Sequence, residues 1–343
     1  MATIKQIAYL AGVSRGTVDR VLNRRGHVNT ETETKVLSIV EALGYSPNRL
    51  GKNLSIRKKG FRFGYILFGS VTGNPFFEDM LVGIRHKVME LEQYGIEVEV
   101  LHTALDDPMK QVALMDDLVA KGANGIALTP IQHPLVEAKI NELADKGIPV
   151  ITANSDLENS KRLAYVGSDG LKGGRTAAGL LCLITGGKSN IGIVMGSKDV
   201  RGHVQRVQGF SDYVEENYPD MHIADIVTNN DDDLESYDET LKMLQNHPEI
   251  DSIFLVSGGV RGTCRAVQSM NLAGKLRIVS FDMVPYTRKM IKEGVIYASI
   301  GQQPEVQGGK PLDILLDYLG MDTPPLQEKY FTQNEIKIRE NLL

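Results

Sequence analysis

Short apolar runs alternate with amphipathic segments from residue 63 onward, and this alternation restricts the possible folds most strongly. Nine runs read as β-strands, at residues 63–68, 96–102, 125–130, 149–154, 190–196, 223–228, 252–257, 277–282 and 297–302. Segments with helical periodicity, such as 76–94 and 109–122, separate nearly all of them. A βα alternation indicates parallel sheets covered by helices on both faces. So many units exceed one comfortable sheet, and we predict two lobes of about five strands each.

The first sixty residues differ from this body in charge. They hold eleven Lys and Arg residues against four Asp and Glu, whereas the remainder of the chain holds 27 against 39. A small basic head on an acidic body indicates a module that binds a polyanion. A basic disordered tail is the alternative, and the amphipathic helical patterns in the head argue against it.

The head contains three helical patterns. The first carries an apolar stripe from Ile4 to Ala11, Gly12 supplies a turn, and Ser14 is the expected N-cap of the second. The third is expected to begin at Thr30, with Glu33 completing a capping box and Val36, Leu37, Val40 and Leu43 buried. Two helices joined by a short turn, with a third packed on them, describe a helix-turn-helix. Arg15 and Arg20 would then reach base edges or phosphates. An ordinary helical bundle with solvated arginines remains the alternative.

A short amphipathic segment follows the head. Pro47 suits the first turn of a helix, and Leu50 and Leu54 are spaced i, i+4 among polar residues. So short a helix is unstable alone in water. We expect it to fold when two copies cover each other on DNA. The alternative is a plain linker with one amphipathic turn.

The head and hinge resemble the lactose/galactose repressor family, through "TIKQIAYLAGVSRGTVDRVLN" (3–23), "HV" (27–28) and "LGYSPNRLGKNLS" (43–55). The resemblance implies a homodimer on a near-palindromic operator, base readout by Arg15, Gly16 and Arg20, and a phosphate contact by Thr17. It also implies that Leu54 wedges into the minor groove. The other DNA-binding residues that it implies are Thr3, Ser14, Asn23, His27, Asn48 and Arg49. Gly51 stands where the family usually has Ala, at a helix cost of about 1 kcal/mol.

Residues just after the predicted strands should carry the ligand site, because ligands of such sheets bind beyond the carboxyl ends of the strands. These loops are rich in amides, hydroxyls and carboxylates, which match the vicinal hydroxyls of a polyol. The body resembles the sugar-sensing core of the same family, which is similar to ribose- and galactose-type periplasmic binding proteins. The ligand-binding residues implied by this resemblance are Phe76 or Phe77, Asn154, Asp156, Arg206, Ser257, Asp282 and Gln302.

Each of these residues has a structural alternative or a departure from the family. Asn154 stands where the family's strand ends in Asp, and Ser257 replaces the Asn of an Asn-Asp pair. Asn154 and Asp282 could instead serve turns or caps, and Arg206 could form a surface ion pair along its helix. Either phenylalanine could belong to the core.

Other functional classes find little support. No complete phosphate-binding loop, zinc-ligand spacing or nucleophile elbow occurs, so we expect no catalytic residues, metal or cofactor. The acidic run Asp231–Asp233 is interpreted as a charge complement to a helix N-terminus. Two separated cysteines, the lack of a secretory signal and the lack of an 18-residue apolar run predict a cytoplasmic protein.

The predicted architecture is an all-α head followed by two doubly wound α/β lobes of the type I periplasmic-binding-protein kind. The expected boundaries are 1–46 for the head, 47–61 for the hinge, 62–165 plus about 302–331 for the N-terminal lobe, and 166–301 plus about 332–343 for the C-terminal lobe. We expect a DNA-binding transcriptional regulator, acting as a repressor, whose operator affinity is controlled by a sugar or sugar derivative bound between the lobes. The alternative is a sugar sensor that acts through protein partners and carries a non-functional head.

Overall fold

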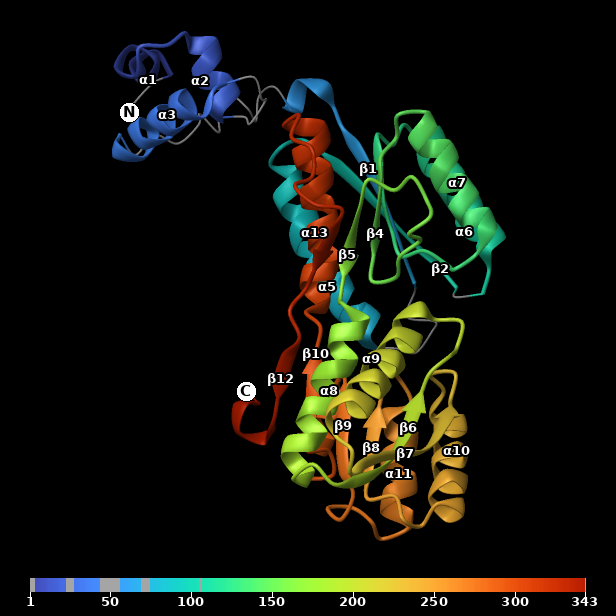
Figure 1. The fold of residues 1–343 in the computed structure, drawn as a ribbon. Coiled ribbons are helices and arrows are strands. Elements are labelled where there is room, and N and C mark those ends of the chain that lie inside the picture. The colour runs from blue at the N-terminus through green and yellow to red at the C-terminus, as the bar shows by residue number, and fades with distance from the viewer. Residues whose placement is uncertain (1–3, 23–27, 44–55, 69–74, 105, 343) are drawn as a thin grey trace.

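Three helices form the head in the computed structural model, which describes residues 4–22, 28–43, 56–68, 75–104 and 106–342 (Figure 1). They are α1 (Ile4–Ala11), α2 (Arg15–Leu22) and α3 (Thr30–Ala42). Their small core contains Ile7, Ala11, Val18, Val21 and Val36. The periodicity therefore located the helices correctly.

Two details of the head differ from the expectation. The side chain of Asn29, rather than a Thr30–Glu33 capping box, caps α3, because its Oδ1 accepts from the backbone N–H of Thr32 at 2.7 Å. Leu37 and Leu43 are exposed rather than buried. In their place Ile39 packs against the core beside Val36, since the buried face of α3 is rotated from the predicted one.

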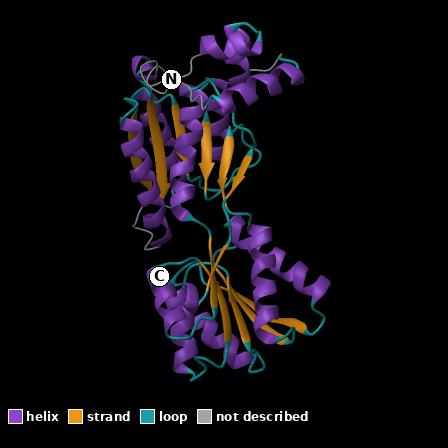
Figure 2. Cartoon of the chain, turned by 90° about the vertical axis from the view of Figure 1, so that its left-hand side faces the viewer, coloured by secondary structure: helices purple, strands orange, loops and turns teal. Residues whose placement is uncertain are grey.

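The first lobe is a six-stranded sheet with the order β11-β5-β4-β3-β1-β2, and all its strands run parallel. Its helices cover both faces (Figure 2). Its elements are β1 (Arg62–Phe68), α5 (Pro75–Glu92), β2 (Glu97–Thr103), α6 (Pro108–Ala120), β3 (Gly125–Leu128), α7 (Pro134–Asp145), β4 (Val150–Ala153), β5 (Ala164–Gly167), α13 (Pro304–Leu315), the π-helical turn η2 (Leu316–Gly320) and β11 (Lys329–Phe331).

The second lobe has the sheet order β12-β10-β9-β8-β6-β7, in which only β12 is antiparallel to its neighbour. Its elements are α8 (Gly170–Thr185), β6 (Ser189–Met195), α9 (Arg201–Asn217), β7 (Met221–Thr228), α10 (Asp233–Asn246), β8 (Ser252–Leu255), α11 (Val260–Ser269), β9 (Arg277–Phe281), α12 (Pro285–Lys292), β10 (Ala298–Gly301), β12 (Glu335–Lys337) and the 3-10 turn η3 (Arg339–Asn341).

All nine predicted strands are present. Three further strands bring the total to twelve, so that each sheet has six strands instead of the predicted five or so. The additional strands are β5, β11 and β12, which have only three or four residues each. Runs this short give no periodicity that distinguishes a strand from a loop.

The chain passes between the lobes three times, from β5 to α8, from β10 to α13 and from β11 to β12. Because the parallel strands of the two sheets end toward each other, these passages lie where the carboxyl ends meet (Figures 1 and 2). The passages are bonded to one another. The N–H of Thr332 donates to the carbonyl of Gly167 at 2.8 Å, and the N–H of Gln333 donates to Oε1 of Gln303 at 3.0 Å.

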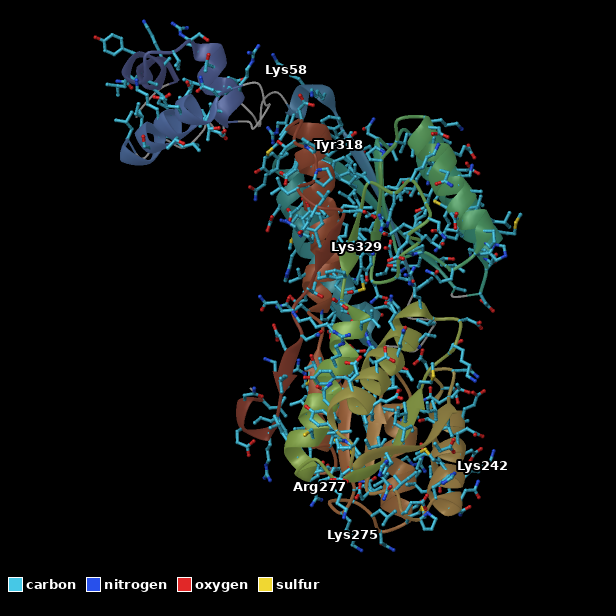
Figure 3. All side chains as sticks on the ribbon, viewed as in Figure 1. Lys58, Lys242, Lys275, Arg277, Tyr318 and Lys329 are labelled. Carbon is cyan, nitrogen blue, oxygen red and sulfur yellow. The ribbon has the colours of Figure 1, made fainter. Side chains whose placement is uncertain are left out.

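Helix α13 links the lobe junction to the point where the head joins the body. It begins at Pro304 beside the second passage and packs along α5, and it continues into η2. Ile56, in a helical turn at residues 56–59, is 1% exposed and belongs to the same core as Leu316. Lys58 and Tyr318, labelled in Figure 3, mark this end of the lobe.

Candidate functional site: a DNA-facing helix and an interlobe polar cluster

The second helix of the head presents a basic, exposed face. Ser14 caps α2, since its Oγ accepts from the N–H of Thr17 at 3.0 Å. Val18 and Val21 turn toward the core, whereas Arg15, Gly16 and Arg20 are exposed. This is the orientation that a recognition helix needs, with its N-terminal end free to enter the major groove. The remaining predicted DNA contacts lie outside the described residues; they are Thr3, Asn23, His27, Asn48, Arg49 and Leu54.

A polar cluster occupies the junction of the two sheets. We name it the interlobe cluster, and it consists of Asn154, Ser168, Arg206, Asp282, Gln302 and Gln307. These residues come from four strand ends, those of β4, β5, β9 and β10, and from the helices α9 and α13. Four of them, Asn154, Arg206, Asp282 and Gln302, are predicted ligand-binding residues.

Arg206 lies at the centre of the cluster and is 5% exposed. One Nη donates to the carbonyl oxygen of Val256 and the other to Oε1 of Gln302, both at 2.9 Å. The guanidinium carbon lies 4.0 Å from the centroid of the Phe281 ring, a cation–π contact. Arg206 is therefore fixed in place and is not part of a surface ion pair along its helix.

Gln302 connects the second passage to both lobes. Its Oε1 accepts from Ser168 Oγ at 2.7 Å, in addition to Arg206, and its Nε2 donates to Oδ1 of Asp282 at 2.7 Å. Its backbone carbonyl accepts from Nε2 of Gln307 at 2.7 Å. Gln307 also accepts from Nδ2 of Asn154 at 3.1 Å, so the predicted residue of the first lobe joins the same network.

Burial changes the protonation equilibria in this cluster. It raises the pKa of the Asp282 carboxyl, while the nearby Arg206 and the hydrogen bond from Gln302 oppose that shift. It also lowers the pKa of the Arg206 guanidinium, which Asp282 opposes. The two side chains therefore depend on each other for their charged forms.

The other predicted ligand residues are placed differently. Asp156 is held by Arg162, which donates to its Oδ2 at 2.7 Å, and by Thr152, which donates to its Oδ1 at 2.8 Å. Phe76 and Phe77 are 4% and 8% exposed and belong to the core of the first lobe. Their contact with a ligand stays a prediction. Ser257, directly after Val256, is 4% exposed, and its Oγ has no hydrogen-bond partner among the described residues.

Two residues beside the cluster were not predicted as site residues. His203 lies one helical turn before Arg206, and its Nε2 is 4.0 Å from Oδ2 of Asp231. Asp231 follows β7, and its Oδ1 accepts from the N–H of Gly258 at 2.8 Å. The interpretation of Asp231–Asp233 as a charge complement to a helix N-terminus is confirmed for Asp232, the N-cap of α10, and for Asp233 in its first turn, whereas Asp231 precedes the cap and bonds to Gly258 instead. Its position after a predicted strand was the signal that could have identified it.

Metal-ligand groups and membrane-spanning helices are both absent from the part of the chain that the structure describes. No group of three or more His, Cys, Asp or Glu side chains that could hold a metal occurs in the described ranges. None of the helices described is both long and apolar enough to cross a membrane.

The fold and the site together define a class of protein, a helix-turn-helix head joined to a two-lobed ligand-binding core. Residues 65–322 match the family model "Periplasmic binding protein domain", and residues 3–48 match "Bacterial regulatory proteins, lacI family". The chain belongs to the lacI family of transcriptional regulators, which is not a family of enzymes, and its core is a periplasmic binding protein domain.

Individual relatives agree with this assignment. The ribose operon repressor of Halalkalibacterium halodurans is 29% identical over 297 residues, which cover 85% of this chain and 83% of that protein. The ribose import binding protein RbsB of Bacillus subtilis is 26% identical over 283 residues, covering 80% and 87%. The structure of GanP, a glucose-galactose binding protein from Geobacillus stearothermophilus, has a TM-score of 0.73 at 22% identity and covers 82% of this chain and 99% of its own. The last likeness shows the fold alone. The chain is thus a transcriptional repressor with a core like that of sugar-binding proteins.

Proposed function

We propose that a sugar or sugar derivative binds at the interlobe cluster and controls the affinity of the head for an operator. The observation that carries this proposal is a pair of buried polar atoms. Nε of Arg206 and Oγ of Ser257 have no hydrogen-bond partner among the described residues. A buried polar group without a partner costs about 1–3 kcal/mol. A ligand hydroxyl placed between Arg206 and Ser257 would satisfy both atoms.

The route from ligand to DNA follows from the passages between the lobes. A ligand held by Arg206 and Asp282 on one side and by Asn154 on the other would favour one angle between the lobes, since a ligand shifts an equilibrium by its differential affinity. The predicted hinge at 47–61 would transmit that change to a homodimer bound to a near-palindromic operator. The resemblance of the head and hinge to the lacI family supports the DNA-binding part of this mechanism, and the names of the relatives support the sugar-binding part.

The ligand part is tested by differential scanning fluorimetry with a panel of sugars. The double variant Arg206→Ala with Asp282→Ala should lose the thermal shift that the unmodified chain gives. Arg277→Ala is the matched control, because this arginine lies at the far end of the second lobe (Figure 3). A full shift in the double variant would show that the ligand binds elsewhere.

The DNA part is tested with Arg20→Ala, which removes an exposed arginine of α2. Specific operator binding should fall at least about tenfold, the lower end of what one arginine–guanine contact contributes, while the sugar response stays. Lys35→Ala on α3 removes the same charge from the head and serves as control. An unchanged operator footprint for Arg20→Ala would favour the alternative, a sugar sensor that acts through protein partners.

A further inference from the structure

The carboxylate of Asp231 lies among the strand ends of the second lobe. Besides the bond from Gly258, its own N–H donates to Oδ1 of Asn229 at 3.0 Å. A Cβ at Gly196 or Gly258 would come within 2.6 or 2.9 Å of Asp231 Oδ1, so both glycines make room for this carboxylate. Asp231 is thus built into the ends of β6 and β8 beside Arg206, which feels its charge.

The other two carboxylates at the junction each have a cation that compensates their charge. Asp282 lies in the field of Arg206, and Asp79 on α5 lies in the field of Arg288 on α12. Asp231 shares the charge of Arg206 with Asp282. Its other neighbour is His203, whose pKa burial lowers to about 4, so the imidazole is neutral near pH 7 and adds no positive charge.

The cations at the junction already interact with protein groups. Both Nη atoms of Arg206 donate to neutral protein acceptors, and its Nε has no hydrogen-bond partner among the described residues. Arg288 is exposed, and its Nε donates to the carbonyl of Met283 at 2.9 Å. Lys198 and Asp199 are consecutive exposed residues of opposite charge in the loop after β6. An anionic ligand would thus meet the carboxylate of Asp231, and the nearby Arg206 already balances the charges of Asp231 and Asp282.

We propose that the interlobe cluster prefers neutral to anionic sugars and that Asp231 rejects sugars that carry a carboxylate or a phosphate. This inference rests on the proposed function of the cluster as the effector site. A neutral sugar can donate a hydroxyl to Oδ2 of Asp231 while Arg206 Nε donates to a ring or hydroxyl oxygen. A second negative charge a few ångströms from a partly buried carboxylate is repelled by an energy equivalent to tenfold or more in affinity.

The first experiment measures dissociation constants of the full chain by isothermal titration calorimetry near pH 7. The probes are D-ribose, D-glucose and D-galactose, together with D-glucuronate, D-galacturonate, ribose 5-phosphate and D-glucosamine. We expect at least one neutral sugar to bind, and its acidic counterpart to bind at least about tenfold more weakly. Tighter binding of an acidic sugar than of its neutral counterpart would overturn the rejection of anionic ligands, and much weaker binding of D-glucosamine than of D-glucose would contradict a negative charge at the site. No binding of any probe would contradict the proposed function itself.

The second experiment uses Asp231→Asn. Asparagine keeps an Oδ1 acceptor for the N–H of Gly258 and tolerates the left-handed backbone at this position, where φ is 60°. The ratio of the acidic to the neutral dissociation constant should fall at least about tenfold, even if both constants change. Asp238→Asn removes an exposed charge from α10 in the same lobe and should leave the ratio unchanged. An unaltered ratio in Asp231→Asn would remove Asp231 from the proposal.

Discussion

Gln302 shows how one amide joins the two lobes. Its carbonyl oxygen accepts from Ser168 and Arg206, while its NH2 group donates to Asp282. A glutamate could still accept from Ser168 and Arg206, but it could not donate to Asp282 when ionised. The amide is thus the group that satisfies a cation and a carboxylate at the same time, and this explains why it is almost completely buried.

His203 makes the stability of the protein sensitive to mild acid. Its pKa is about 4 in the folded chain against an ordinary 6.5, so between these values the unfolded chain binds more protons. The free energy of unfolding should therefore fall by about 2–3 kcal/mol as the pH drops from 6.5 to 4.

Urea unfolding at a series of pH values measures this loss. His203→Asn should reduce it, whereas His222→Asn, which replaces an exposed histidine, should retain it. Equal acid sensitivity of the two variants would exclude His203 as the cause.

Helices α5 and α13 are in contact through glycines. A Cβ at Gly83 would collide with the backbone carbonyl of Glu305, and one at Gly308 with that of Met80. Gly83→Ala should therefore lower the free energy of unfolding by about 1–3 kcal/mol, the usual cost of overpacking.

The matched control for this packing is Gly179→Ala in α8, where a Cβ meets nothing within 4 Å. That variant should be neutral or more stable by up to about 1 kcal/mol, because alanine favours the helix. Thermal unfolding of both variants checks the pair, and similar effects at the two sites would argue against a close approach of α5 and α13.

At the scale of elements, the sequence predicted most of this structure. The nine apolar runs and the three head helices were recognisable because their periodicity extends over enough residues. Strand β11 could not be recognised in this way, since three residues carry no period and its pairing partner β5 lies far away in the chain. Arg206 and Asp282 were predicted as ligand-binding residues by resemblance, but the contacts of Arg206 with Val256 and Phe281 depend on tertiary packing that no local pattern contains.

The charge asymmetry of the whole molecule predicts a strong salt dependence of DNA binding. The basic head would release counterions from phosphates, and six to ten phosphate contacts correspond to a loss of about 10³–10⁵ in affinity between 50 and 200 mM salt. Fluorescence anisotropy with an operator fragment at increasing KCl concentrations measures this dependence. A flat titration would contradict the assignment of the head as the phosphate-binding part.

Helix α13 has the geometry of a lever. Its twelve residues span about 18 Å, so a tilt of about 5° at the end next to Gln303 displaces the opposite end by about 1.6 Å. That opposite end continues into the turn against which Ile56 packs, and Ile56 lies within the predicted hinge at 47–61. A tilt of α13 too small to disturb either lobe would thus displace the residues next to Ile56 by a distance comparable to the length of a covalent bond.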